Sequence, residues 1–180
     1  MPNMTETDAL RAMVEESSRG NAGAFKELYD ALVNRVFVYL ASRTDRTTAT
    51  DLTQDCFVEI WKALPSFKYR SEPEFHSFVF IIVKRTLAKH YGSKHTKAGK
   101  ETSELDEETI SAESKDETSR IEVEQLLETL DETAREIIIL HHWSRYTFPE
   151  IAEMLHMTES AVRTRHHRTL TTLQAKLTSA

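Results

Sequence analysis

The sequence is poor in the residues that form turns and interrupt helices, with only four Gly and four Pro in 180 residues. Such a composition predicts long helices and few strands. The single cysteine, Cys56, excludes an internal disulfide and fits a reducing compartment. No apolar run is long enough to cross a bilayer, and no basic segment precedes an apolar one near the start. We therefore expect a cytoplasmic protein without membrane insertion.

Acidic residues are unevenly distributed, and this matters more than the net charge of −6. Residues 1–91 contain 12 Lys/Arg and 12 Asp/Glu, residues 92–131 contain 5 and 12, and residues 132–180 contain 6 and 5. The acidity is thus concentrated in the middle of the chain. Both flanking blocks remain free to approach a phosphate backbone.

Apolar periodicity divides the chain into two helical blocks. Apolar residues recur at three- and four-residue steps over 24–41 and again from Leu52 to Leu64, where Pro65 ends the run. A third helix is predicted from about Glu74 to Tyr91, and its apolar centre FVFIIV indicates a buried core helix. We predict an all-α fold with a tail and helix start at 1–23, a helical domain at 24–91, a flexible acidic linker at 92–118 and a second helical domain at 119–180.

The last thirty residues have the spacing of a helix-turn-helix. Ile151, Ala152 and Leu155 form the inward face of its first helix, and Thr158 is a suitable N-cap for the second. The opposite face of the second helix is polar and basic. We expect its residues Ser160, Arg163, Thr164 and His167 to contact base edges, and Arg165, Arg168 and Lys176 to contact phosphates. The competing interpretation is a solvated basic helix in a bundle.

Catalytic and metal sites are not expected. His141-His142 and His166-His167 are adjacent pairs, and neighbours on a helix point in different directions. The sequence lacks a Cys pair, an HExxH motif, a Gly-rich phosphate loop and a nucleophile paired with a base. We predict no enzymatic activity, no cofactor and no metal.

Read together, the two blocks resemble the extracytoplasmic-function (ECF) group of bacterial sigma factors. The first block supplies AFKELY, DLTQDCFVEIWKALPSF and FHSFVFIIVKRTLAKHY, and the second supplies LLETLDETAREIIILHH and FPEIAEMLHMTESAVRTRHHRTL. These segments are similar to the second and fourth conserved regions of that family in order and spacing. The resemblance implies a protein that binds core RNA polymerase and directs it to promoter DNA.

The resemblance also assigns roles to individual residues. The segment DLTQDCFVEIW would dock on the polymerase largest subunit through Asp51, Gln54, Asp55 and Glu59, whereas Leu52, Phe57, Ile60 and Trp61 are expected in the core. Opening of the minus-ten element needs basic and aromatic groups. The resemblance assigns this role to Lys68, Tyr69, Arg70, His76, Lys84, Arg85, Lys89 and His90, while Phe78 and Phe80 are expected in the core. The C-terminal helix-turn-helix would read the minus-thirty-five element.

Several positions depart from the pattern of that family. It often has Asn at the position of Arg85, a small residue at Val83, and Gly at Arg145 and His156. Relatives also commonly carry an acidic stretch where this chain reads Thr48-Ala49-Thr50-Asp51. Because a phosphothreonine carries roughly −1.5 to −2 charges near neutral pH, phosphorylation of Thr50, or secondarily Thr48, would restore the missing acidity. The simpler alternative is that these threonines only cap the helix.

The expected partners are core RNA polymerase, promoter DNA and a serine/threonine kinase, and an anti-sigma factor is less expected. Two other classes of protein remain open at this point. A helix-turn-helix regulator acting independently of core polymerase would bind duplex DNA tightly by itself. A protein-interaction scaffold would show no salt-dependent DNA binding.

Overall fold

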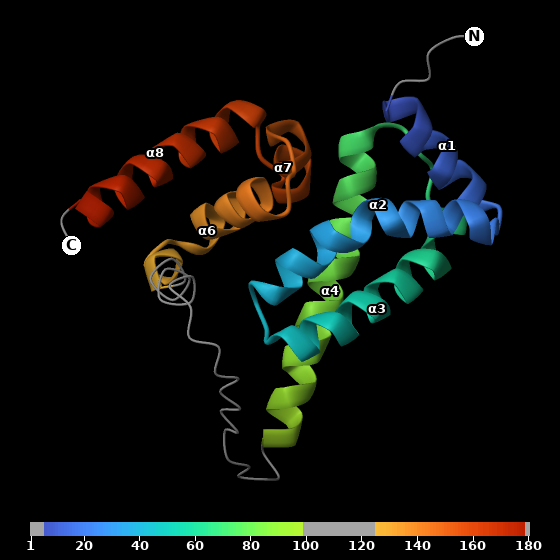
Figure 1. Cartoon of the computed structure of the whole chain (residues 1–180), viewed down its shortest axis with the longest axis horizontal. Coiled ribbons are helices and arrows are strands. Elements are labelled where there is room, and N and C mark those ends of the chain that lie inside the picture. Colours follow the sequence, from blue (N-terminus) through green and yellow to red (C-terminus); the bar gives the residue numbers. More distant parts are fainter. Residues whose placement is uncertain (1–5, 99–124, 179–180) are drawn as a thin grey trace.

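The computed structural model describes residues 6–98 and 125–178 (Figure 1). The first block contains α1 (Glu6–Ser18), α2 (Ala22–Ala41), α3 (Arg46–Ala63), a 3-10 turn (Leu64–Ser66) and α4 (Glu72–Ala98). The second contains α6 (Glu132–Ile138), the π-helical turn η2 (Ile139–Trp143), α7 (Phe148–Leu155) and α8 (Glu159–Thr178). Within these two ranges there is no strand, which confirms the all-α prediction.

Short polar side chains define where α2 and α3 begin. Asn21 Oδ1 accepts hydrogen bonds from the backbone N–H groups of Gly23 and Ala24 at 3.0 and 3.2 Å, and Asp45 Oδ1 accepts one from Thr48 N at 2.9 Å. These bonds satisfy donors that have no partner inside the helix. The residues 1–23, predicted as a tail and helix start, include a separate helix, α1, that packs on α2.

The third predicted helix, α4, is longer than expected. It begins at Glu72 because Pro73 falls in the first turn, where a missing N–H costs nothing. It continues to Ala98, so residues 92–98 of the predicted linker are helical, and residues 99–118 lie outside the described ranges. Within the predicted apolar centre FVFIIV, Val79, Phe80, Ile82 and Val83 are buried as expected, whereas Phe78 is half-buried and Ile81 is 44% exposed.

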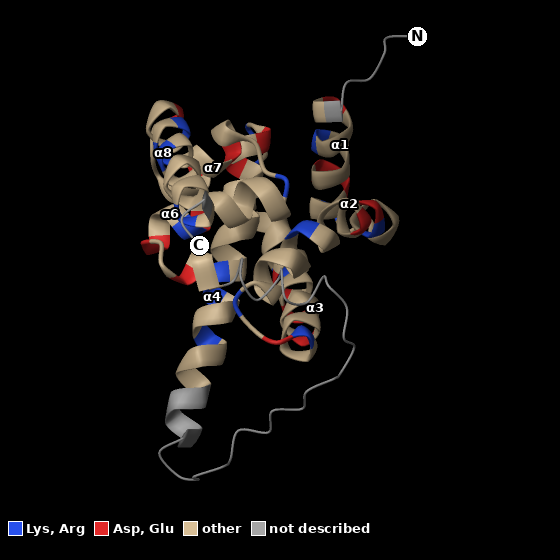
Figure 2. Cartoon of the chain, turned by 60° about the vertical axis from the view of Figure 1, so that its left-hand side comes forward, with Lys and Arg blue, Asp and Glu red and all other residues tan. Residues whose placement is uncertain are grey.

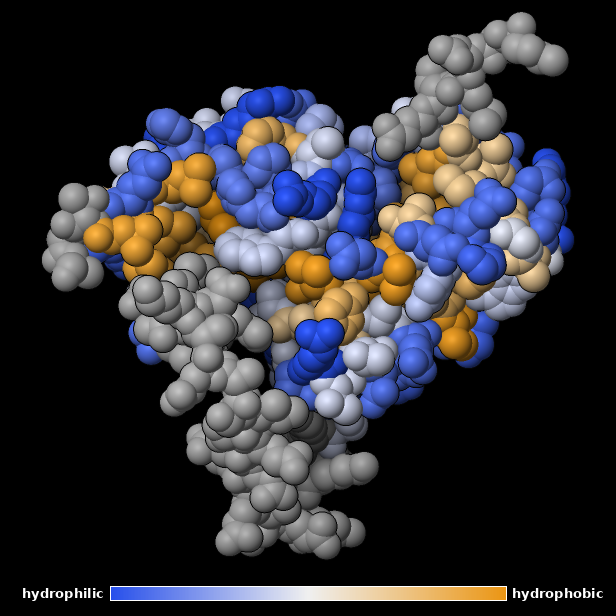
Figure 3. Space-filling view, in the orientation of Figure 1, coloured by the Kyte–Doolittle hydropathy of each residue, from blue (hydrophilic) through white to orange (hydrophobic). Residues whose placement is uncertain are grey.

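The two blocks pack against each other, which the sequence did not predict. α7 lies on α4, η2 contacts α2, and residues from both blocks form one continuous hydrophobic core (Figure 1). On the face shown in Figure 3, hydrophilic side chains dominate and hydrophobic ones form separate patches. None of the helices in the described ranges has the length and apolar content needed to cross a bilayer. In this arrangement α7 covers the part of α4 that contains His76, one of the residues predicted to bind the minus-ten element.

Candidate nucleic-acid interface

The predicted helix-turn-helix is formed by α7 and α8. Thr147 and Glu150 make a reciprocal capping box at the start of α7, and Thr158 Oγ1 accepts a hydrogen bond from Ala161 N at 3.2 Å at the start of α8. Between the helices, His156 adopts a left-handed conformation with φ of 53°, and Met157 N donates to Ala152 O at 2.9 Å. These contacts satisfy the free backbone groups at both helix ends and fix the turn.

The outer face of α8 presents the residues that the sequence analysis selected for base contacts. Their side chains are all exposed, whereas Val162 on the opposite face is fully buried. In Figure 1, α6 and α7 lie between α8 and the first block. The exposed residues on this face are Ser160, Arg163, Thr164, His167 and Arg168.

Several cations of α8 already have partners within the second block. Arg165 Nη2 lies 2.7 Å from Asp131 Oδ1 at the start of α6, and Lys176 Nζ donates to Thr129 Oγ1 at 2.7 Å. Arg163 pairs with Glu159 at 2.6 Å and its guanidinium lies over the Phe148 ring. Because these pairs are exposed, each is weak and can exchange for a phosphate at small cost.

The residues predicted for the minus-ten element are not all on one accessible surface. Five basic side chains on α4 and the preceding loop are exposed, and Figure 2 shows basic positions along α4 as well as α8. Tyr69 and His90 are half-buried. Lys84 Nζ is 2.6 Å from Glu136 Oε1 of α6, and His76 is only 2% exposed because α7 covers it. The five exposed residues are Lys68, Arg70, Lys84, Arg85 and Lys89.

Two buried glutamates of the second block organise this contact with the first. His76 Nε2 lies 3.0 Å from Glu150 Oε1, and an Arg35 nitrogen is 3.8 Å from the same oxygen. Burial opposes ionisation of Glu150, but the hydrogen bond and charge of His76 and the bonds from Thr147 outweigh it and lower its pKa to about 2. The carboxylate is thus held ionised between the two blocks.

Glu136 occupies the second polar contact between the blocks. Its carboxylate accepts hydrogen bonds from the Tyr39 hydroxyl at 2.7 Å and from Lys84 at 2.6 Å. An Arg43 nitrogen lies 3.7 Å from the same oxygen. Burial, followed by the charge of Glu136, raises the pKa of Tyr39, which therefore stays a neutral donor. Sequence reasoning missed both glutamates as binding groups, because each lies in a helix whose partner was unknown.

The predicted polymerase-facing edge of α3 is exposed along its length. Asp51, Gln54, Asp55 and Glu59 are all exposed, and Glu59 pairs with Lys62 at 2.8 Å. The residues predicted for the core lie on the other side of the helix, where Leu52, Phe57 and Ile60 are buried and Trp61 is half-buried. α3 is therefore an amphipathic helix with one face sealed and a polar face turned to solvent.

The threonines at the start of α3 differ in their surroundings. Thr50 is exposed and its hydroxyl donates to Arg46 O at 3.0 Å, whereas the Thr48 hydroxyl donates to Asp45 Oδ2 at 2.6 Å. Thr53 is buried, with its hydroxyl 2.6 Å from Ala49 O. The N-cap of the helix is Asp45, which Thr48 supports through its hydroxyl, whereas the Thr50 hydroxyl is not bonded to the N-cap residue.

The histidines of the second block lie closer together than the sequence reasoning allowed. One ring nitrogen each of His141, His142 and His166 falls within 4.8 Å of the other two. The argument that adjacent histidines diverge fails here because the pair lies in a π-helical turn and a third ring arrives from α8.

Comparison with known proteins accounts for both blocks. Residues 28–96 match Sigma-70 region 2, and residues 120–173 match Sigma-70 region 4. The ECF RNA polymerase sigma factor ShbA of Streptomyces griseus is 29% identical over 94% of this chain and 96% of its own length. The ECF RNA polymerase sigma factor SigD of Mycobacterium tuberculosis is 28% identical over 99% of this chain and 89% of its own length.

Solved structures support the same fold. CnrH in complex with the cytosolic domain of CnrY gives a TM-score of 0.68 at 24% identity, covering 96% of this chain and 99% of that one. The sigma factor RpoE of Bartonella quintana, in complex with the anti-sigma factor NepR, gives 0.60 at 18% identity, covering 86% and 96%. An independent helix-turn-helix regulator is not favoured, because region 2 accounts for the first block. The chain belongs to the sigma-70 family as an ECF-type sigma factor, a DNA-binding factor of transcription initiation rather than an enzyme.

Proposed function

We propose that this sigma factor acts in the cytoplasm, binding core RNA polymerase through the exposed edge of α3 and promoter DNA through α4 and α8. In this proposal residues 24–91 form the unit for polymerase and the minus-ten element, and residues 119–180 form the unit for the minus-thirty-five element. The observation that carries it is the exposure of two polar helix faces, on α3 and α8, whose opposite faces are sealed in the core.

In-vitro transcription with purified core polymerase tests this assignment directly. The full chain should direct synthesis from defined start sites on a genomic promoter library, and strong promoter binding should require the polymerase. Substituting Asp51 and Asp55 by Asn should reduce polymerase affinity without changing promoter preference. The exposed Gln174 on α8 is outside the proposed polymerase contact, and its replacement by Ala should leave this affinity unchanged. Equal polymerase affinity for wild type and the double variant would exclude the α3 assignment.

We further infer that phosphorylation of Thr50 raises the affinity for polymerase. The first turn of α3 contains no acidic residue, and Thr50 lies exposed directly before Asp51 on the proposed polymerase edge. A phosphate there adds roughly −1.5 to −2 charges to that edge. Thr48 is the second choice, because its hydroxyl is bonded to the Asp45 carboxylate, which would repel a phosphate. A serine/threonine kinase is the corresponding partner, ahead of an anti-sigma factor.

The Thr50 proposal is tested by comparing Thr50→Glu with Thr50→Gln, which differ in charge but hardly in shape. The Glu variant should bind core polymerase several-fold more tightly than the Gln variant, and protein phosphorylated at Thr50 more tightly still. Thr47→Glu, on the same exposed surface but outside the Thr48–Asp51 stretch, serves as the control for added charge. If phosphorylated and unmodified proteins bind polymerase equally, Thr50 is no switch, and the sigma-factor assignment is unaffected.

A further inference from the structure

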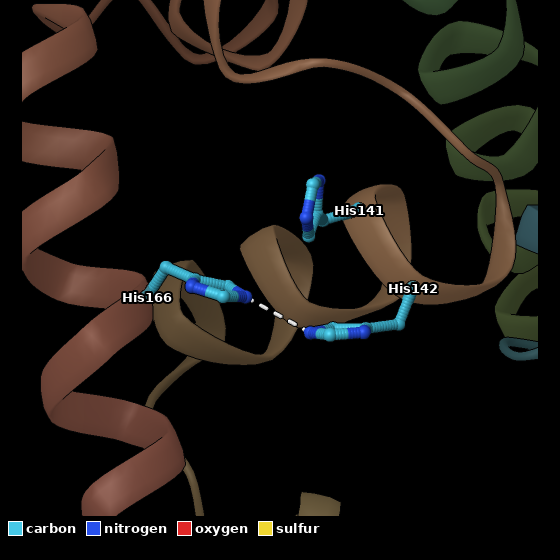
Figure 4. Close-up of side chains that lie close together, drawn as sticks. All are labelled: His141, His142 and His166. Carbon is cyan, nitrogen blue, oxygen red and sulfur yellow. Dashed lines mark hydrogen bonds between the residues drawn. The ribbon is translucent and has the colours of Figure 1, made fainter.

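Three histidines from two helical segments gather where η2 meets α8 (Figure 4). His141 and His142 come from η2 and His166 comes from the middle of α8. Nε2 of His142 lies 2.9 Å from Nε2 of His166, and those two rings are nearly parallel. The His141 ring stands across both, with its centroid 5.0 Å from each. The three imidazoles therefore face a common point from three directions.

We propose that His141, His142 and His166 bind one divalent transition-metal ion of the zinc type. Imidazole ligands suit zinc, copper and nickel, whereas magnesium and calcium require oxygen ligands. At a Zn–N distance of about 2.0–2.1 Å, ligand nitrogens in a tetrahedral site are about 3.4 Å apart. The distances between the histidine nitrogens, 2.9 Å for one pair and all within 4.8 Å, reach this value with modest side-chain rotation. His142 is exposed, so a fourth position faces solvent.

Neighbouring groups hold the His141 ring in an orientation suited to a ligand. Its Nδ1 lies 2.9 Å from the Tyr146 carbonyl oxygen. A carbonyl only accepts hydrogen bonds, so Nδ1 donates and Nε2 keeps the lone pair that binds metal. Metal-binding histidines commonly make this bond with the other ring nitrogen. The Phe148 ring stacks on His141 at 4.3 Å and contacts the edge of His166 at 5.0 Å, which restrains both rings.

The protonation state of the cluster also suits a metal. Burial lowers the pKa of His142 and of His166, and the positive charge of a protonated His141 lowers both further. Close imidazoles cannot all be protonated, because their charges repel one another. The lowered pKa values of His142 and His166 favour the neutral form that binds metal, so fewer protons compete with the ion at these two rings. A bound ion would join η2 to α8 and fix the orientation of the DNA-facing helix.

Metal titration of the untagged full chain tests the proposal. One equivalent of Co²⁺ should produce the visible absorption of a tetrahedral nitrogen site, and Zn²⁺ should displace it. Zn²⁺ at about 100 times its dissociation constant should raise the melting temperature by about 5 °C or more, whereas Mg²⁺ should not. His142→Gln removes an exposed ligand that the fold does not need, so it should weaken Co²⁺ binding at least about tenfold with unchanged helical content.

The matched control is His167→Gln, which alters the exposed histidine next to His166 on α8 and should bind Co²⁺ like the wild type. His166→Gln should lose binding as His142→Gln does. The proposal is overturned if the wild type binds no Co²⁺ or Zn²⁺ at micromolar concentrations. It is equally overturned if His142→Gln and His166→Gln retain wild-type binding, because the ion would then lie elsewhere.

Discussion

At the scale of single residues, His156 and Arg145 adopt a backbone conformation that glycine tolerates best. Their φ angles are 53° and 63°, in the left-handed region. For a residue with a Cβ atom this conformation costs about 1–2 kcal/mol. The family that the sequence resembles often has Gly at both positions, and the φ angles of 53° and 63° give a physical reason for that preference. The fold accepts the strain because hydrogen bonds on either side of the turn fix the backbone.

Replacing His156 by Gly should therefore stabilise the protein. The side chain is exposed, so its removal loses little packing. The free energy gained by relieving the backbone strain should exceed the free-energy cost of the extra conformational entropy that glycine gives the unfolded chain. We expect the free energy of unfolding in urea to rise by about 0.5–1 kcal/mol. His156→Ala is the control, since it removes the same side chain but keeps the Cβ atom. Equal stability of the Gly and Ala variants would contradict the role of backbone strain.

At the scale of secondary-structure elements, the outer face of α8 separates into residues expected to read bases and residues expected to hold phosphates. Arg168 is exposed on this face, one residue from His167. A cation that neutralises one phosphate releases condensed counterions whatever the base sequence. A polar group at a base edge changes the preferred sequence instead. The two roles can therefore be separated by salt dependence.

We expect Arg168→Ala in the holoenzyme to weaken promoter binding. The slope of the logarithm of the binding constant against the logarithm of the salt concentration is negative, and its magnitude should fall by about 0.9. Preference at each base of the minus-thirty-five element should stay unchanged. His167→Ala should do the opposite, relaxing that preference with little change of slope. Thr171→Ala, also exposed on α8, is the control for general damage to the helix. An unchanged slope for Arg168→Ala would mean that this residue does not contact phosphate.

The helices themselves were largely predictable because their apolar residues repeat with the helical period. The buried positions of Leu28, Leu32, Val36 and Leu40 follow directly from that repeat. Periodicity carries no information about which helix a polar residue meets, so the buried setting of Glu136 was not predictable. The histidine cluster was missed for a related reason, since it depends on a π-helical turn and on the docking of α8.

At the scale of the whole molecule, the contact between the first and second blocks covers part of the surface proposed for the minus-ten element. Glu150 of α7 holds His76, and Glu136 of α6 holds Lys84. His76 is 2% exposed and cannot reach DNA while its contact persists, whereas Lys84 is paired but its side chain remains 43% exposed. If α4 binds the promoter through His76, as proposed, the two blocks must separate at this contact. In that case the free energy of binding polymerase, the proposed partner, can drive the opening.

Glu150 gives a direct measure of how strongly the units hold together. The groups that face it are His76 and Glu72 on α4, Arg35 on α2 and Thr147 at its own helix start. Its pKa is lowered from 4.5 to about 2, so its contribution to stability is fully present above about pH 5 and is lost as pH falls toward 2. The shift corresponds to about 3 kcal/mol, similar to the cost of breaking a buried ion pair.

Glu150→Gln should lower the free energy of unfolding at pH 7 by about 3 kcal/mol, because the Gln amide leaves His76 and Arg35 without their anion. Urea unfolding at a series of pH values should show this gap closing between about pH 5 and pH 2, where the wild-type carboxylate becomes protonated. Glu153→Gln, an exposed change on the same helix, should leave stability unchanged across that range. Small-angle scattering of the free Glu150→Gln protein should also detect a larger radius of gyration, since the units separate more often. A gap that stays constant down to pH 2 would show that ionised Glu150 does not hold α7 on α4.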